Sequence, residues 1–154
     1  MESIPEDARW YLANLILEIR IEGDPRNVIH INTRLIKADT PELAYRKAVD
    51  LGRAGEMEYD NTNDKLVKCS FRGIRNLEVI QDDLEDGAEL FYEEHIGIAE
   101  NEIRGWAKYR DELSVFAPRE KLAEVPNFMP KSIAEDLVAE GMPRTEITGW
   151  EHES

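Results

Sequence analysis

The sequence has few of the residues that usually reveal chemistry or a cellular compartment. Among its 154 residues there are three histidines and a single cysteine, Cys69. One cysteine excludes an internal disulfide and a multi-cysteine zinc site, and it fits a reducing compartment. No stretch approaches the roughly 18 consecutive apolar residues of a membrane-spanning helix, and the acidic N-terminus lacks the apolar run of a signal peptide. We therefore expect a cytoplasmic protein that does not contact a membrane.

The sequence also lacks the short motifs that identify common active sites. It has no Gly-x-Ser-x-Gly, no phosphate-binding glycine loop, no His-Glu-x-x-His and no dinucleotide fingerprint. Carboxylates are too abundant for any pair to stand out as a general acid and base. Cys69 alternates with polar residues in a predicted strand, which indicates a buried, inert thiol. The sequence therefore favours a non-catalytic protein over an enzyme, and it indicates no cofactor.

Basic residues are scarce in the second half of the chain, and the net charge is −14. Residues 1–77 carry 13 acidic and 12 basic residues, whereas residues 78–154 carry 20 and 7. We call residues 78–102 the acidic segment, because it has no Lys or Arg and contains Glu78, Asp82, Asp83, Glu85, Asp86, Glu89, Glu93, Glu94, Glu100 and Glu102. A surface of this sign repels nucleic acid and attracts a basic protein. Solubility alone is the other interpretation.

Strict alternation marks residues 9–22 as the strand around which the chain is organised. One face is apolar throughout, and the other begins with Trp10, Leu12 and Ile16 and ends in charged residues. This pattern predicts a strand that is buried on one face. At about 3.3 Å per residue the strand is unusually long, so it bends or forms the centre of a sheet. The partly apolar second face is a candidate interface that either lies under the C-terminal tail or forms a contact in a homo-oligomer.

A second strand is predicted over residues 28–37, after a turn-forming stretch at residues 23–27. The two strands are expected to pair as an antiparallel hairpin. His30 lies opposite the apolar row of this strand, so we predict a surface histidine. The apolar row consists of Ile29, Ile31 and Leu35.

The clearest helix start follows directly, in four residues that can cap a helix and begin it. Thr40 is one candidate cap, with Pro41 in the first helical position. Asp39 is the alternative, with Glu42 closing a capping box. The helix is predicted over residues 41–54, and a stripe of small side chains lets it lie close to a sheet.

Shorter patterns complete the predicted fold. Further strands are predicted at residues 57–59, 66–71, 77–80, 89–96 and 113–116. A short second helix is expected over residues 99–107, and prolines punctuate the tail, where only residues 133–141 look helical. The sequence therefore predicts an α+β fold with an antiparallel sheet of five to seven strands and one main helix on one face. Residues 1–117 are expected to form one domain, and residues 118–154 a C-terminal extension that packs on the domain or extends from it.

Three stretches of the chain carry a resemblance to a known family. They are Trp10–Ala13, Ile36–Ala44 and Asp86–Leu90. These stretches resemble a small bacterial group, the domain-of-unknown-function family 4288. The resemblance covers about residues 9–117 and leaves the tail outside. It implies an α+β fold and these domain limits, and it implies no mechanism because the family name assigns no activity.

The acidic segment also contains candidate metal ligands. Asp82, Asp86 and Glu93 take positions 1, 5 and 12 of a calcium-binding loop. Leu84 takes position 3 and has no side-chain oxygen, so an acidic turn is the simpler interpretation. Glu93 and His95 alternate onto one face of a predicted strand as a two-ligand pair, without an evident third ligand.

Together these observations favour an acidic protein-binding module. We expect it to dock a basic partner through carboxylates of the acidic segment, namely Asp82, Asp83, Glu85, Asp86, Glu89 and Glu93. Immunity proteins and antitoxins share its small size, its acidity and its lack of catalytic motifs, which is an analogy of properties. The alternatives are a metal-binding or hydrolytic domain that uses carboxylates around residues 82–95, and a structural or oligomer-forming role.

Overall fold

The computed structural model describes residues 10–116 and 126–141. The chain divides into two compact units, and we describe each by itself. The first unit comprises residues 1–91 and 125–154, and the second comprises residues 92–124. The predicted boundary between residues 117 and 118 lies outside the described residues, as do residues 118–125 and 142–154 of the predicted C-terminal extension.

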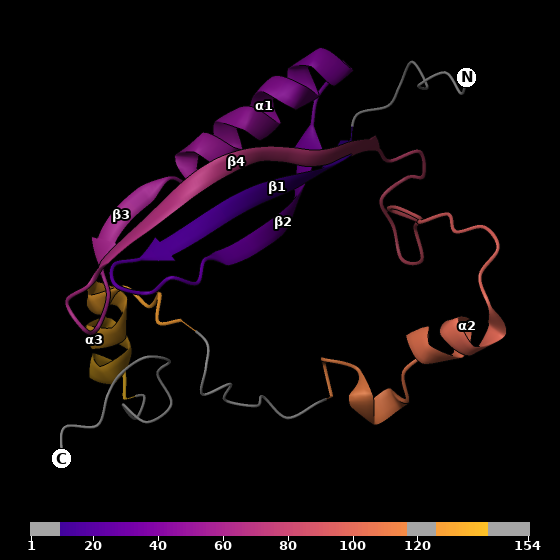
Figure 1. The fold of residues 1–154 in the computed structure, drawn as a ribbon. Helices are drawn as coiled ribbons and strands as arrows, with labels where there is room; N and C mark the ends of the chain where they lie inside the picture. Colours follow the sequence, from indigo (N-terminus) through magenta and orange to yellow (C-terminus); the bar gives the residue numbers. More distant parts are fainter. Residues whose placement is uncertain (1–9, 117–125, 142–154) are drawn as a thin grey trace. The chain divides into compact units, whose positions relative to one another are not determined.

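The first unit is built on a four-stranded antiparallel sheet with the order β2-β1-β4-β3 (Figure 1). The strands are β1 (Trp10–Ile21), β2 (Val28–Lys37), β3 (Met57–Asp60) and β4 (Leu66–Val79). β1 has a neighbour on each side, so the predicted central strand is confirmed. The predicted hairpin of β1 and β2 is also confirmed, with Leu12 opposite Leu35 and Ile16 opposite Ile31.

The predicted five to seven strands are not confirmed, because the described residues form four. Residues 66–71 and 77–80 belong to one strand, β4, which continues past Gly73. The register of β4 against β1 shifts twice around Gly73, whose φ is +129°. A bulge lets a strand absorb an extra residue and continue, and glycine readily adopts this conformation. Residues 89–96 and 113–116 are not in strands.

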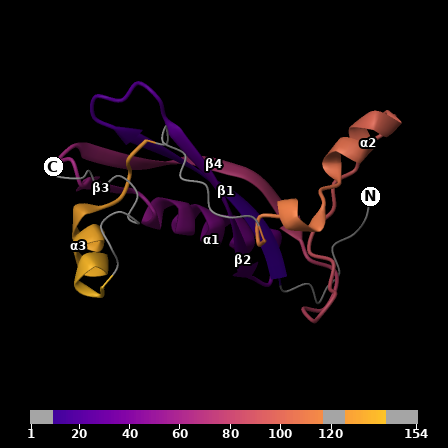
Figure 2. The same ribbon diagram turned by 90° about the horizontal axis from the view of Figure 1, so that it is seen from below.

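Helix α1 (Pro41–Ala54) lies along one face of the sheet (Figures 1 and 2). Thr40 caps it, because its Oγ1 accepts a hydrogen bond from the Leu43 backbone N–H at 3.2 Å. Of the two predicted caps the structure therefore has Thr40, with Pro41 in the first turn. The buried residues of α1 are small, which brings the helix close to the strands, and they are Ala44, Ala48 and Gly52.

The core lies between α1 and the sheet. Its buried residues are Tyr11, Ala13, Leu15, Ile36, Ala38, Ala44 and Ala48. A second cluster further along the same face of β1 contains Ile19, Ile21 and Val67, with Phe128 packed against it. The Phe128 ring meets His30 edge-on, with the ring centroids 5.5 Å apart. His30, predicted at the surface, is therefore half-buried beside Phe128 on the α1 face.

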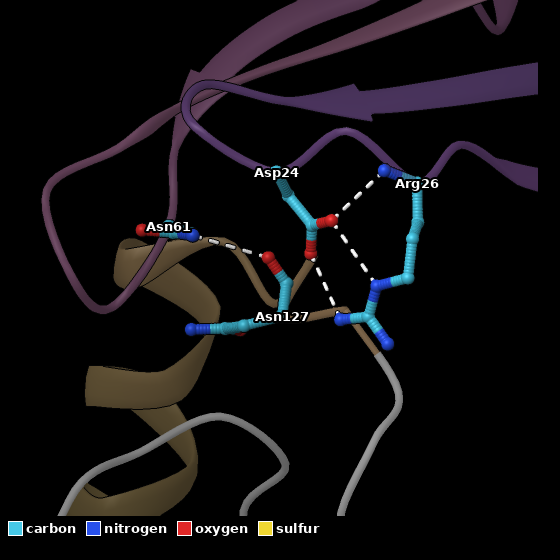
Figure 3. Close-up of polar contacts among 4 residues, drawn as sticks. All are labelled: Asp24, Arg26, Asn61 and Asn127. Atoms are coloured by element: carbon cyan, nitrogen blue, oxygen red, sulfur yellow. Dashed lines mark hydrogen bonds and ion pairs between the residues drawn. The ribbon is translucent and has the colours of Figure 1, made fainter.

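Polar contacts tie the segment before helix α3 (Lys131–Ala139) to the sheet (Figure 3). The side chain of Asn61 is 1% exposed, and its Nδ2 donates to the Asn127 carbonyl at 3.1 Å. Its Oδ1 accepts two backbone N–H bonds of 2.9 Å from its own loop. The Tyr59 hydroxyl donates to the Phe128 carbonyl at 2.6 Å. A buried amide satisfied in this way fixes both the loop after β3 and the segment that enters α3.

An ion pair closes the turn between β1 and β2 (Figure 3). Asp24 accepts hydrogen bonds from the guanidinium of Arg26 at 3.0 and 3.1 Å, and from its backbone N–H at 2.9 Å. The Arg26 side-chain bonds, followed by the backbone bond, hold the pKa of Asp24 below its usual range. The turn is thus fixed locally, which supports the register of the hairpin.

The second unit contains helix α2 (Glu100–Trp106) and a 3₁₀ turn, η1 (Arg110–Glu112). Neither element buries a side chain, and the residues that follow, 113–116, form turns. With α1 and α3, the described residues contain three α-helices, so the prediction of one main helix is not confirmed. No helix in the described part of the chain is long and apolar enough to cross a membrane.

Candidate functional site

The acidic segment leaves the sheet after β4 and has no helix or strand over residues 80–98. Its first part forms a small loop, which closes where the Glu89 backbone N–H donates to Asp82 Oδ2 at 3.1 Å. Gly87 lies in this loop with a φ of +85°, a conformation that favours glycine. The Asp82 carboxylate thus closes the loop from within, and the carboxylates of the loop are exposed.

All six predicted partner-binding carboxylates are exposed, five in the first unit and Glu93 in the second. Glu93 has a basic neighbour, since its Oε2 lies 3.1 Å from His95 Nε2. Asp82 accepts the backbone bond that closes the loop. Within the described residues no ion pair or side-chain hydrogen bond involves the carboxylates of Asp83, Glu85, Asp86 and Glu89.

The candidate metal ligands do not form a cluster. Among the described residues, no group of three or more His, Cys, Asp or Glu side chains is placed to hold a metal ion. Glu93 and His95 do meet, and the imidazole also lies against Trp106, with the ring centroids 5.2 Å apart. Asp82 and Asp86 belong to the loop in the first unit. The metal hypothesis therefore depends on the pair of Glu93 and His95.

The candidate interface on β1 is part of a larger apolar surface. The hairpin register places Leu35 beside Leu12 and Ile31 beside Ile16. The β2 side chains of this surface are 43–48% exposed, and α1 lies on the opposite face of the sheet. We call the whole set the open face, which comprises Trp10, Leu12, Ile16, Ile29, Ile31 and Leu35. Sequence reasoning grouped the β2 residues but did not join them to β1, although the alternation of the hairpin carried that signal.

Charged groups bound the open face at both ends. Glu18 accepts a hydrogen bond from Asn27 Nδ2 at 2.7 Å, and two arginines lie 3.2 and 3.5 Å from its carboxylate. The Asn27 bond, together with the arginines, holds the pKa of Glu18 below its usual range. At the other end the Lys37 ammonium lies 5.5 Å from the centroid of the Trp10 ring. The apolar surface thus has a charged border of both signs.

An open cavity of 360 Å³ lies where β2 meets α1. Its lining residues are Leu35, Ile36, Lys37, Lys47, Asp50 and Leu51. Lys47 Nζ donates to the Lys37 carbonyl at 2.5 Å, so this ammonium is engaged at the rim. The lining combines apolar side chains with both charge signs, and it does not define a class of ligand.

Cys69 lies in β4 and is partly buried against the second core cluster. Burial raises the pKa of its thiol, and the nearby Glu56 carboxylate raises it further. A thiol with a raised pKa is a poor nucleophile at neutral pH. These surroundings fit the predicted inert thiol.

The fold and these surfaces define a small α+β domain with an antiparallel four-stranded sheet that carries α1 on one face and has the exposed β2 side chains of the open face on the other. Residues 10–92, more than half of the chain, match the family described as domain of unknown function (DUF4288), and the chain belongs to this family. The resemblance seen in the sequence is therefore confirmed. The match includes the whole sheet, α1 and the loop of the acidic segment. No curated protein and no solved structure matches the chain.

Proposed function

We propose that the chain is a non-catalytic protein-binding module that docks a basic protein partner through its acidic segment. The observation that supports this most is the state of the carboxylates at residues 82–89. They are exposed, they lie outside helices and strands, and no basic side chain pairs with them among the described residues. A basic surface can therefore contact them without first breaking ion pairs within this chain.

The conformation of the loop adds a second argument. The bond from Glu89 to Asp82 closes the loop, and Gly87 adopts the positive φ of its turn, so both restrict the conformations of the loop. A preorganised loop loses less conformational entropy on binding than a disordered acidic run does. The acidic segment contains no Lys or Arg, so its local field is negative throughout and speeds the approach of a basic partner.

Immunity proteins and antitoxins are the concrete form of this proposal. Such a protein blocks a toxin by occupying it and needs no catalytic group of its own. The comparison rests on size, charge and the lack of catalytic motifs in the sequence, and on no shared motif.

The proposal is tested by capturing partners from the native cell lysate with the full chain at low and moderate salt. The four-site variant Asp82→Asn, Asp83→Asn, Glu85→Gln, Asp86→Asn is expected to lose a basic protein that the wild type retains. The identified partner is then purified, and its Kd is measured at both salt concentrations. We expect at least a tenfold weaker Kd for the variant, about 1.4 kcal/mol, and a smaller salt dependence.

A matched control removes the same charge elsewhere in the first unit. It carries Glu42→Gln, Asp50→Asn, Glu58→Gln and Glu135→Gln, all exposed positions outside the acidic segment. The control is expected to bind almost as tightly as the wild type. If both variants lose the same affinity for the partner, the effect depends on total charge alone, and the acidic segment is not the docking surface.

The second candidate function is metal binding, and the contact of Glu93 with His95 is the observation that favours it. A bound metal stabilises the folded state, so excess Zn²⁺, Ca²⁺ or Mn²⁺ is expected to raise the melting temperature. His95→Ala is expected to abolish that rise. An unchanged melting temperature with all three metals would exclude the candidate.

A further inference from the structure

Strand β2 lacks three of the features that usually protect the edge of a sheet, since it is long and has neither a bulge nor a proline, although it carries the charged residues Arg34 and Lys37. It forms one border of the sheet, runs for 10 residues and pairs with β1 in an uninterrupted register (Figure 1). It contains no proline and no acidic residue. Natural edges are usually short, bulged, charged or interrupted by proline, because an open edge invites another strand. The opposite edge follows this rule, since β3 has only four residues and Asn61 bridges to Pro130 just after it.

The hydrogen bonds of β1 determine which backbone groups of β2 point away from the sheet. The Trp10 carbonyl accepts from the Ile80 N–H at 2.9 Å, and the Glu22 N–H donates to the Leu66 carbonyl at 2.8 Å. Even-numbered residues of β1 therefore face β4, and odd-numbered ones face β2, because backbone groups alternate along a strand. The hairpin register pairs the odd-numbered residues of β1 with even-numbered residues of β2. The residues of β2 that point outward are Ile29, Ile31, Thr33, Leu35 and Lys37.

These outward groups have few partners. The Lys37 carbonyl accepts from Lys47 Nζ, and within the described residues no other outward N–H or C=O of β2 is hydrogen-bonded. The same odd-numbered residues carry the β2 side chains of the open face. Ile29, Ile31 and Leu35 have a neighbouring strand on one side only, which explains why they are 43–48% exposed. A strand added here would satisfy the backbone groups and cover these side chains together.

We propose that the added strand is β2 of a second copy of this chain. The two β2 strands run antiparallel across a two-fold axis and join both sheets into one sheet of eight strands. Thr33 faces its own copy beside the axis, Ile31 faces Leu35, and Ile29 faces Lys37. Every outward N–H and C=O from residue 29 to residue 37 is then paired with the other copy.

The side chains favour this register of the two β2 strands over registers shifted by two residues. On the α1 side of the sheet, Asn32 then lies opposite Arg34, and His30 lies opposite Ile36, so no like charges are opposed. A shift of two residues in one direction sets Arg34 against itself. Directly opposed like charges destabilise a sheet, and a shift in the other direction sets His30 against Arg34 and shortens the paired length. Larger shifts shorten the paired length.

The charge distribution favours this edge as the meeting point of two copies. Two molecules with a net charge of −14 repel each other. β2 contains no acidic residue, so pairing at this edge does not set the carboxylates of the two copies against each other. The inference does not depend on the proposed function, because the acidic segment plays no part in the contact.

Disulfide crosslinking of the full chain tests the register directly. Opposed residues of a hydrogen-bonded antiparallel pair have Cα atoms about 5.5 Å apart, within the span of about 4.4–6.8 Å that a disulfide bridges. Thr33→Cys is therefore expected to form a covalent dimer under mild oxidation. Ile29→Cys is the matched control, because each copy of residue 29 lies about 26 Å from the other along the paired strands. Both variants keep Cys69, and the wild type shows how far that thiol crosslinks alone.

A Thr33→Cys chain that stays monomeric, or an Ile29→Cys chain that crosslinks equally well, would overturn the proposal. Sedimentation equilibrium supplies an independent readout. The wild type is expected to have the mass of a dimer, and Thr33→Pro the mass of a monomer, because proline removes an outward N–H. The backbone bonds from β2 to β1 stay in place, whereas the side-chain bond from Asn14 Nδ2 to Thr33 Oγ1, 2.8 Å long, is lost with the hydroxyl. Ile16→Lys alters the open face without touching the edge and is expected to stay dimeric. A monomeric wild type, or a dimer lost only in Ile16→Lys, would contradict edge pairing.

Discussion

Leu12 and Leu15 belong to the same strand, yet they lie on opposite faces of the sheet. Leu15 is 2% exposed in the core under α1, whereas Leu12 lies on the open face. The two faces of β1 are similarly apolar at this end of the strand. They differ in the element above them, because α1 presents a stripe of small residues to one face only.

The comparison teaches that apolar character alone does not identify the covered face. On β2 the more polar face of the strand is the covered one. His30 and Arg34 share a face with the core, and Ile36 is the β2 residue that is buried there, while the apolar row of β2 is exposed. The small side chains of α1 bring it close to the sheet, and its position decides which strand positions are buried.

The largest expected effect is the difference between Leu15→Ala and Leu12→Ala. Leu15→Ala is expected to lower the free energy of unfolding by about 2–5 kcal/mol, because it leaves a cavity in the packed core. Leu12→Ala is expected to lower the free energy of unfolding by less than Leu15→Ala does, because the Leu12 side chain is partly exposed. Urea denaturation of both variants measures the difference.

Leu12→Ala also serves as the test of the open face. If it costs as much as Leu15→Ala, the open face is covered in solution by other residues or another molecule, and the contrast between the faces fails. Repeating the measurement over a range of protein concentrations separates these cases. A cost that grows with concentration indicates another molecule, since association stabilises the folded state by mass action.

The second effect concerns how closely α1 approaches the sheet. A Cβ atom at Gly52 would lie 2.3 Å from Cε1 of Phe71. Gly52→Ala is therefore expected to lower the free energy of unfolding by about 1–2 kcal/mol, because overpacking outweighs the gain of about 1 kcal/mol in helix propensity. Phe71→Leu removes the opposing ring atoms. In that background Gly52→Ala is expected to be neutral or stabilising, and an unchanged cost there would show that Phe71 is not the obstacle.

The local elements of this fold could be predicted from the sequence. The alternation in β1 and β2 and the cap of α1 depend on residues that are neighbours in the sequence. The predicted bounds of these three elements agree with the structure to within a few residues. The sequence predicts separate strands at residues 66–71 and 77–80, because glycine usually interrupts a strand, whereas the pairing with β1 continues β4 through Gly73 as a bulge.

The parts that could not be predicted depend on distant residues. Residues 89–96 have a strand pattern, but a strand needs a neighbour, and none pairs with them in the described part of the chain. The covered face of β2 depends on where α1 lies. For the candidate site, the charge of the acidic segment could be read from composition, whereas the bond from Glu89 to Asp82 could not, because it depends on the path of the loop.

A smaller effect tests how α1 is fixed over the covered face. Thr40→Ala is expected to lower the free energy of unfolding by about 1 kcal/mol, because the Leu43 N–H loses its side-chain acceptor. Thr40→Ser keeps a hydroxyl in place and is expected to lie within a few tenths of a kcal/mol of the wild type. Thermal and urea denaturation measure both variants. Equal behaviour of the two variants would mean that the hydroxyl bond is not what caps the helix.

The smallest effect lies at the charged end of the open face. The Asn27 bond and the two arginines hold the pKa of Glu18 below its ordinary value of 4.5. A carboxylate with a lowered pKa in the folded state stabilises the fold above its unfolded pKa, and this contribution is lost as the pH falls below that value. The wild type is therefore expected to lose slightly more stability than Glu18→Gln between about pH 6 and about pH 3.

Glu58→Gln is the matched control for Glu18→Gln, because Glu58 is exposed on β3 and makes no ion pair or side-chain hydrogen bond among the described residues. Melting temperatures of the three proteins are compared across the same pH range. The difference in melting temperature between the wild type and Glu18→Gln is expected to shrink as the pH falls. The difference between the wild type and Glu58→Gln is expected to stay small at every pH. If the difference in melting temperature between the wild type and Glu18→Gln grows at low pH, the effect has the opposite sign to the expected one, and the Asn27 bond does not favour the ionised form of Glu18.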